Sequence, residues 1–366
     1  FVEESDAPVV NCCLNVGSRY RKAFNDQVRA VKSRIEPKMQ AEFWEILGRI
    51  EVVLGTDLRS GTRGVAVFAR GGTHPFFRPL QFGAPLPNRV TISRTPQLYP
   101  LVELRDNYYR YVVLLSTEES ARILEIDVGT VKETFRIARP GLRRRDGREW
   151  TRDHLQSHTQ ARLQQFVHEQ VRLLDQAVTS GDYRHLVLAG DPRAIAHVHK
   201  ALPRHLRGIV IGTVRASDKD RSPDLGEATL AAFEAHKETE SLSVVEQFGY
   251  EIGTRGAAVQ GTVECFRALQ GSNARTLILS QAYDPGPGHA CRACNGILPE
   301  RRPRACPACG RTDLRPIDIR EEMVRMAERN RCAIEIVKSS GAMTPYGGVG
   351  CLLRYFTPEP DRKPAA

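Results

Sequence analysis

Short apolar runs and helix-spaced apolar positions predict an α+β domain at the start of the chain. Apolar runs at 9–16, 64–69 and 76–82 read as strands, the last interrupted by a proline. Between them, Phe43, Leu47, Ile50 and Leu54 recur at helical spacing, and Gly55 ends the series. We therefore expect one α+β domain over residues 1–105.

The next segment combines two patterns. Three alternating apolar runs predict an antiparallel meander, and a long amphipathic helix then precedes a strand, a helix and a further strand. The predicted elements are, in order, 111–116, 121–127, 131–137, 163–177, 185–190, 195–202 and 208–213. A meander followed by β-α-β is the order of a ribonuclease H-like domain. We place this middle domain at residues 106–222.

A third group follows a predominantly helical stretch at 222–257. Helices and strands alternate again and predict a small α-β-α sandwich, interrupted by a cysteine-containing insertion. The predicted elements are helix 261–270, strand 276–280, helix 318–330, strand 333–337 and strand 350–356. The sequence thus predicts a protein of α/β and α+β class with three domains, the third over residues 223–366.

Composition and charge narrow the class of partner. The chain has 366 residues, 41% of them hydrophobic and 26% charged, which is typical of a globular protein. Its net charge is +10, mostly from arginine, so RNA or DNA is the natural partner, with an arginine-rich composition as the alternative. No apolar stretch is long enough to cross a bilayer, and no basic segment followed by an apolar run opens the sequence. We expect a cytoplasmic protein without membrane contact.

Four of the nine cysteines form two CxxC pairs separated by eleven residues. Two CxxC turns can direct four thiolates at one tetrahedral ion, which leaves no open coordination position. We therefore predict a structural Zn²⁺ site, with a disulfide pair or a redox motif as the alternatives. The predicted ligands are Cys291, Cys294, Cys306 and Cys309. The other five cysteines lie in apolar surroundings and are expected to be core residues.

The densest positive cluster lies between the meander and the long helix. Seven arginines fall within 17 residues, and such a cluster repels itself unless anions neutralise it. The candidate RNA-binding residues of this predicted loop, 138–158, are Arg139, Arg143, Arg144, Arg145, Arg148, Arg152, His154, Gln156 and His158. The alternative is an ordinary polar helix start, capped by Thr151 or Ser157.

These residues, in this order, resemble the archaeo-eukaryotic class I release factor and Pelota superfamily, in particular its bacterial branch with the Balon-like ribosome hibernation factors. The resemblance covers nearly the whole chain and rests on the order of several motifs. They are GVAVFA (64–69) with FFRP (76–79), YVVLLSTEESARILEID (111–127), HLVLAGDP (185–192), VECFRAL (263–269) with TLIL (276–279), and GGVGCLLRY (347–355). Archaeal members of this superfamily also carry a cysteine knuckle in the third domain.

The resemblance implies a monomeric, tRNA-shaped protein that enters the ribosomal A site and contacts the rRNA of both subunits. Its N-terminal domain is expected in the decoding centre, and its middle domain is expected to reach toward the peptidyl-transferase centre. An L7Ae-like third domain would face a translational GTPase such as elongation factor Tu. A non-catalytic hibernation or stress factor that excludes tRNA is the leading hypothesis.

Two departures from the superfamily pattern bear on activity. Release factors carry a Gly-Gly-Gln tripeptide at the tip of the middle domain, whereas this chain has His154-Leu155-Gln156 there. A Cβ at both positions before the glutamine makes the required backbone costly, so no catalytic residue is assigned. The segment VKSR (31–34) is similar to the stop-codon-reading element in only part of its letters, and it contributes Lys32 and Arg34 as candidate RNA contacts.

Two enzymatic alternatives remain open at this stage. A rescue factor would hydrolyse peptidyl-tRNA, with Gln156 or Gln160 ordering the water. A nuclease would use the ribonuclease H-like domain and needs clustered carboxylates for two divalent metals. The first predicted hairpin offers such acids at Glu118, Glu119, Glu125 and Asp127, without partner acids on the later strands.

Overall fold

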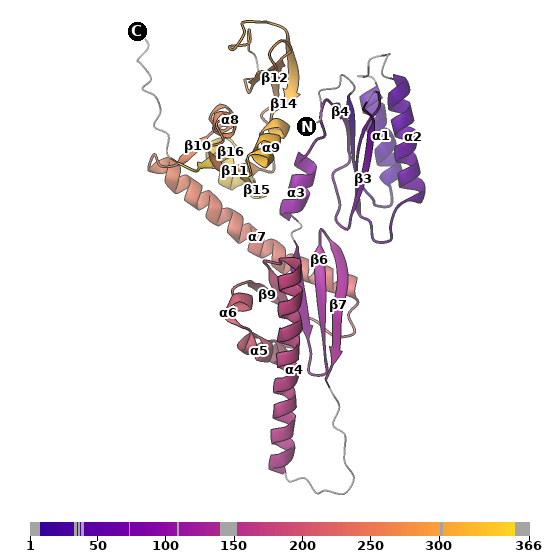
Figure 1. Ribbon diagram of the computed structural model, residues 1–366, viewed down its shortest axis with the longest axis vertical. Helices are drawn as coiled ribbons and strands as arrows, with labels where there is room; N and C mark the ends of the chain where they lie inside the picture. Colours follow the sequence, from indigo (N-terminus) through magenta and orange to yellow (C-terminus); the bar gives the residue numbers. More distant parts are fainter. Residues whose placement is uncertain are drawn as a thin grey trace.

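The computed structural model has mixed α/β architecture, with four sheets (Figure 1). It describes residues 8–32, 35, 37, 40–72, 74–107, 110–139, 152–300 and 303–355, without the side chains of 107, 152–159 and 340. Three of the sheets each organise one domain, and the fourth belongs to the cysteine insertion. The predicted fold class and number of domains are confirmed. Within the described ranges, no helix combines the length and apolar character needed to cross a membrane.

The N-terminal domain is built on an antiparallel sheet in the order β3-β2-β1-β4. Its strands are β1 (Val9–Asn15), β2 (Gly64–Arg70), β3 (Phe76–Phe82) and β4 (Arg89–Ser93). Helices α1 (Tyr20–Lys32) and α2 (Gln40–Thr56) cover one face. Strand β1 is buried on both faces, because Val10, Cys12 and Leu14 contact these helices while Cys13 faces a second apolar cluster.

That second cluster includes helix α3 (Tyr99–Asn107), which also contacts the C-terminal domain. Leu101 and Leu104 pack with the N-terminal sheet, whereas Tyr99 and Val102 are part of the C-terminal core. The carboxylate of Glu321, in the C-terminal domain, accepts hydrogen bonds from the backbone N–H groups of Leu98 and Tyr99. The helix therefore ties the first and third domains together.

The middle domain has a five-stranded sheet in the order β7-β6-β5-β8-β9. Its strands are β5 (Tyr111–Ser116), β6 (Ser120–Asp127), β7 (Thr130–Ala138), β8 (Leu186–Gly190) and β9 (Val210–Arg215). The first three are antiparallel, and β8 and β9 are parallel to β5, as the ribonuclease H-like order predicts. Val112 and Leu114 face one apolar layer, and Val113 and Leu115 face the other.

Helices cover both faces of this sheet. On one side lie α4 (Arg152–Gly181), α5 (Pro192–Ala201) and the short α6 (Arg204–Arg207); on the other lies α7 (Ser222–Gly253), which continues into the C-terminal domain. At the edge toward the N-terminal domain, Gly83 and Gly129 meet so closely that an added Cβ on either would lie within 3 Å of the other's backbone. Glycine is required at this contact because there is no room for a side chain.

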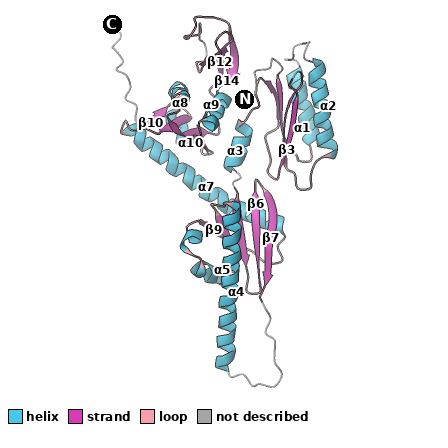
Figure 2. Ribbon diagram, in the orientation of Figure 1, coloured by secondary structure: helices cyan, strands magenta, loops and turns pink. Residues whose placement is uncertain are grey.

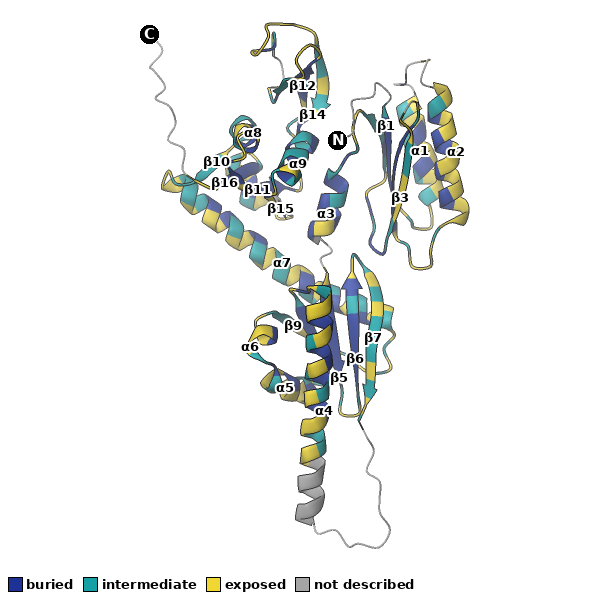
Figure 3. Cartoon of the chain, in the orientation of Figure 1, coloured by how far each residue is buried: buried dark blue, intermediate teal, exposed yellow. Residues whose placement is uncertain are grey.

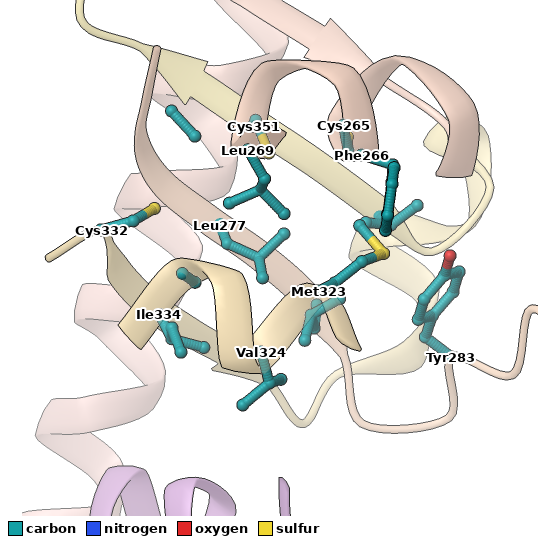
Figure 4. Packing of buried hydrophobic residues seen from close by; sticks show 14 of the residues in the cluster. Cys265, Phe266, Leu269, Leu277, Tyr283, Met323, Val324, Cys332, Ile334 and Cys351 are labelled. Atoms are coloured by element: carbon teal, nitrogen blue, oxygen red, sulfur yellow. The ribbon is translucent and has the colours of Figure 1, made fainter. Parts of the chain in front are cut away.

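The C-terminal domain is an α-β-α sandwich with the sheet order β10-β16-β11-β15. Its strands are β10 (Ala258–Gln260), β11 (Ala274–Ser280), β15 (Ala333–Val337) and β16 (Val349–Leu353). Helices α8 (Thr262–Gln270) and α9 (Ile319–Arg329) cover one face, where Phe266, Leu277 and Met323 pack together (Figure 4). Helix α7 and the short α10 (Ser340–Met343) cover the other.

One element boundary differs from the sequence prediction in a way that matters for function. The predicted loop ran to residue 158, but α4 already begins at Arg152 and is 30 residues long. Apolar periodicity detects only the part of a helix that faces a core, and among the described side chains of α4 the first to pack against the core is Leu163. The polar turns before it were therefore assigned to the loop.

Candidate metal centre and RNA-binding surface

Four cysteine sulfurs converge in the insertion of the C-terminal domain, which we call the cysteine knuckle (residues 287–318). It contains the small sheet of β12 (Pro287–Cys291), β13 (Ile297–Leu298) and β14 (Leu314–Asp318). The four ligand atoms all lie within 4.8 Å of one another, and they belong to Cys291, Cys294, Cys306 and Cys309. The sequence prediction of these four positions as one ligand set agrees with this geometry.

The two CxxC turns have matching backbone hydrogen bonds. The N–H of Asn295 donates to the carbonyl of Cys291 at 3.0 Å, and that of Gly310 donates to the carbonyl of Cys306 at 2.8 Å. Asn295 and Gly310 both have positive φ, at 55° and 71°, which closes each turn after its second cysteine. The matching turns place their sulfurs on opposite sides of one shared centre.

The donor set fits a tetrahedral metal ion. Sulfur–sulfur distances are 3.5 Å for Cys291–Cys309 and 3.5 Å for Cys294–Cys306. Zn–S bonds of about 2.3 Å in a tetrahedron set neighbouring sulfurs about 3.8 Å apart, close to these values. Backbone N–H groups of Cys294 and Ala293 lower the pKa of the Cys291 thiol to about 7, whereas side-chain hydrogen bonds with Cys306 and Cys309 raise the pKa of Cys294 to about 12. The Cys291 sulfur is therefore the more readily ionised of the two.

The candidate RNA-binding residues of the middle domain are only partly described. Arg139 follows β7, is half-buried, and its backbone N–H donates to the carbonyl of Glu119 at 2.6 Å. Arg152, His154, Gln156 and His158 lie on the first turns of α4, and their side chains are outside the described residues. The remaining candidates, Arg143, Arg144, Arg145 and Arg148, also lie outside the described residues.

The start of α4 extends beyond the core of its own domain. Figure 2 shows the helix continuing well past the ends of the strands that it covers. Among the described side chains of α4, those of residues 160–162 belong to no apolar cluster. The eleven residues 152–162 span roughly 16 Å at 1.5 Å per residue. Such a helix end can enter a cavity of a partner while the rest of the domain stays outside.

In the N-terminal domain, Lys32 ends α1 and is exposed, with its Nζ 5.3 Å from the centre of the Trp44 ring. Trp44 lies on α2 and keeps 45% of its surface exposed. Arg34, the other candidate in this domain, is outside the described residues. An exposed cation beside an exposed indole is suited to contact nucleotides, because a base can stack on the ring.

The acids of the first hairpin do not form a metal site. Within the described part of the chain, the four cysteines are the one group of ligand-type residues close enough to share an ion. Asp127 instead forms an ion pair with Arg110 at 3.4 Å. The nuclease hypothesis therefore gains no support from the carboxylates Glu118, Glu119, Glu125 and Asp127.

Sequence reasoning passed over one further basic surface, on α5 and α6. Residues 192–215 contain five arginine and lysine residues, three histidines and no acid, a pattern that a search for dense charge runs misses. An open groove lies along this surface, lined in part by His199, Lys200 and Arg207. The signal that was available in the sequence is the absence of acids over 24 residues, not the density of cations.

Comparison with known proteins gives one family match and several distant structural similarities. Residues 96–234 match the family described as bacterial archaeo-eukaryotic release factor family 10. Among solved structures, yeast (S. cerevisiae) Dom34 is 10% identical, with 81% of this chain and 82% of that chain covered at a TM-score of 0.44. An archaeal Pelota, described as ribosome-bound with ABCE1, is 10% identical, with 96% and 91% covered at 0.43. The archaeal termination factor aRF1 is 14% identical, with 95% and 92% covered at 0.26. No curated protein matches the sequence.

Proposed function

Because residues 96–234 match the bacterial archaeo-eukaryotic release factor family, which supports the superfamily predicted from the motifs, we propose that this chain is a translation factor that binds the ribosomal A site. The observation that carries the proposal is the projecting start of α4, where the helix backbone continues past the strands that it covers (Figure 2). Seven arginines lie within the 17 residues of sequence that end at Arg152, the first residue of this helix. A protruding, arginine-rich end fits a cavity lined by RNA phosphates.

The A-site occupant that we propose is non-catalytic and acts in hibernation or stress. By filling the site, the protein keeps tRNA and elongation factors out without breaking a bond. The sequence contains no Gly-Gly-Gln tripeptide, and the corresponding position has Leu155 and His154 before Gln156. Side chains at these positions raise the energy of the backbone conformation that release factors use.

The contacts that we propose divide between the domains. Arg139, Arg143, Arg144, Arg145, Arg148 and Arg152 neutralise phosphates of the large-subunit RNA, and His154, Gln156 and His158 contact nucleotides deeper in the site. Lys32 and Arg34 of the N-terminal domain contact RNA of the small subunit. We also propose that the boundaries between the three domains lie at residues 105 and 222.

In the C-terminal domain, we propose that the cysteine knuckle holds Zn²⁺ through Cys291, Cys294, Cys306 and Cys309. All four positions of a tetrahedral ion are then filled by protein, so the metal supplies structure and no open site for a substrate. The L7Ae-like domain that carries the knuckle is the surface that we assign to a translational GTPase such as elongation factor Tu. The protein acts as a monomer, and it acts in the cytoplasm, where ribosomes are.

A second function is favoured by one specific feature, the glutamines of the projecting segment. Gln156 and Gln160 lie within the first turns of α4. If one of them orders a water against a peptidyl ester, the protein rescues stalled ribosomes by hydrolysis. Release of peptide from stalled ribosomes, lost when both glutamines are changed to alanine, supports rescue; complete absence of release leaves occupancy of the site as the function.

The proposed binding is tested by co-sedimentation with purified ribosomes. In the test variant, Arg143, Arg144 and Arg145 are all replaced by glutamate. We expect the wild-type protein to sediment with ribosomes at low and moderate salt and the triple variant to remain in the supernatant. A variant with Lys132→Glu, on the exposed edge strand β7, is the charge control and should behave as wild type. Equal sedimentation of the triple variant and the wild type would refute the role of the arginines.

A further inference from the structure

The surface formed by α5, α6 and the edge strand β9 carries a concentration of positive charge that the proposed α4 contact does not use. Between Pro192 and Arg215 the chain has no Asp or Glu. Among the described residues, no carboxylate lies within ion-pair distance of Arg193, Lys200 or Arg204. Figure 3 shows α6 and much of α5 exposed to solvent.

Neighbouring helices of this domain carry cations that do have carboxylate partners. On α4, Arg172 pairs with Glu169 at 2.7 Å, and at the start of α7, Arg221 pairs with Asp224 at 2.9 Å. Surface ion pairs of this kind contribute little to stability, but they neutralise the cation. A stretch in which such partners are missing keeps its positive potential available for an outside anion.

The positively charged surface contains a groove. It has a volume of about 480 Å³ and is lined by Pro192, Ile195, Ala196, His199, Lys200, Arg207 and Thr213. Apolar side chains of α5 form one part of the lining and cationic or imidazole groups form another. The guanidinium of Arg207 is held in place, because it donates to the backbone carbonyls of Lys200 at 3.3 Å and Leu202 at 3.0 Å.

The arrangement suits a chain of phosphates better than a single anion. The start of α5 is already capped, since the carboxylate of Asp191 accepts from the backbone N–H groups of Arg193 and Ala194. A lone phosphate therefore does not find free helix N–H groups there. Instead, Arg193 and Lys200 lie seven residues apart on the helix, a rise of roughly 10 Å, which is long enough to meet successive phosphates of one strand.

We infer that the groove between α5, α6 and β9 is a second RNA-binding surface, which holds the sugar-phosphate backbone of an RNA strand independently of the projecting end of α4. Riboses lie against Ile195 and Ala196, and phosphates contact Lys200, Arg207 and Arg193. The inference rests on the proposed ribosome binding, in which the strand is a segment of ribosomal RNA. It gives the middle domain two separate points of attachment.

The test uses the full-length chain with Lys200→Glu and the matched control Lys132→Glu, which makes the same charge change on the opposite edge of the same sheet. Affinity is measured over a range of salt concentrations for purified ribosomes and for a short RNA duplex, with polyglutamate as competitor. For Lys200→Glu we expect roughly tenfold weaker binding to both RNA probes and a salt slope smaller by about one, because about one phosphate contact is lost. Lys200→Ala should give a smaller loss in the same direction.

Several outcomes would overturn the inference. One is wild-type affinity and salt slope for Lys200→Glu, and another is an equal loss for Lys132→Glu, which would indicate an effect of net charge alone. Competition by polyglutamate with no effect of Lys200→Glu on RNA would assign the groove to an acidic polypeptide. If the wild-type protein binds the duplex through Lys200 but does not bind ribosomes, the groove stands and the proposed function fails.

Discussion

Two regions of this molecule use positive charge in opposite ways. At the domain junction, formed by Asp106, Lys237, Ser241 and Glu335, the ammonium group of Lys237 lies 3.2 Å from Asp106 and 3.0 Å from Glu335, and its side chain is only 12% exposed. In the α5–α6 groove, Lys200 is exposed and has no carboxylate partner among the described residues. The first cation connects α3, α7 and β15, and the second is available to a partner.

Because Lys237 is paired and Lys200 is not, a count of basic residues cannot identify a binding surface. Arg122 makes the same point within the middle domain: it is 2% exposed, and it contacts the Glu133 carboxylate at 2.7 Å and the carbonyl of Asp220 at 2.6 Å. Its positive charge is neutralised by these contacts inside the fold. Cations that are both exposed and unpaired dominate the local attraction of RNA, so the net charge of +10 does not show where the binding surface lies.

Loss of the proposed metal ion should have the greatest effect on structure, and it concerns a third kind of interaction, neither a buried ion pair nor an exposed cation. Removal of metal with a chelator should unfold the cysteine knuckle, because residues 299–313, which carry two of the four cysteines, contain few apolar residues to stabilise them. Hydrogen exchange should show loss of protection in β12 to β14, with β11 and β15 still protected. Unchanged exchange of the knuckle after complete metal removal would contradict the metal assignment.

The second prediction compares the two lysines directly. Lys237→Met leaves Asp106 and Glu335 buried without their cation and should lower the free energy of unfolding by about 3–5 kcal/mol. Lys200→Met removes an exposed, unpaired charge and should change it by less than about 0.5 kcal/mol. Urea unfolding of both variants measures the difference. Similar losses of unfolding free energy in the two variants would show that the two lysines do not differ in their contribution to stability.

The third prediction concerns pH at the domain junction. Burial, with a smaller effect of Glu335, raises the pKa of Asp106 from 3.8 to about 6, against the opposing effects of Lys237 and the Ile336 N–H. The folded state therefore binds this proton more tightly than the unfolded state. Its contribution to stability is full below about pH 4 and is lost as pH rises through about 6.

Asp106→Asn should remove this part of the pH dependence, because asparagine does not titrate. The unfolding free energy of wild type minus that of the variant, measured from pH 4 to 7, should fall with rising pH by at most about 1.4 kcal/mol per unit. A difference that stays constant over this range would show that Asp106 keeps an ordinary pKa.

The smallest effect concerns an intermediate case, Lys32, which is exposed but lies over Trp44. Exposed cation–π contacts contribute about 0.5–1 kcal/mol to stability. Lys32→Ala should therefore lower the free energy of unfolding, measured in urea, by no more than this amount. Trp44→Phe keeps an aromatic face and is the matched control. A cost above about 2 kcal/mol for Lys32→Ala would place this residue with the domain junction rather than with the exposed cations.

Much of the fold follows from local patterns. The apolar runs of β2, β5 and β8 predicted buried strands, and the CxxC spacing predicted four cysteines in one group, because both signals are short in sequence. The start of α4 could not be predicted in the same way, since its first turns are mostly polar and show no apolar periodicity in the sequence.

Other features depend on contacts between distant parts of the chain. Helix α3 contacts two domains because alternate faces of one short helix carry Leu101 and Tyr99, and the sequence shows the residues but not their partners. The domain junction joins Asp106, Lys237 and Glu335 from three separate segments. The groove was missed because sequence reasoning searched for dense positive charge and not for missing acids.

The most direct test of the central proposal is a cryo-electron microscopy map of ribosomes incubated with the purified protein. We predict density in the A site, with the start of α4 directed toward the peptidyl-transferase centre and the N-terminal domain in the decoding centre. Ribosomes with an empty A site under saturating protein, or density for the protein elsewhere on the particle, would contradict the proposal.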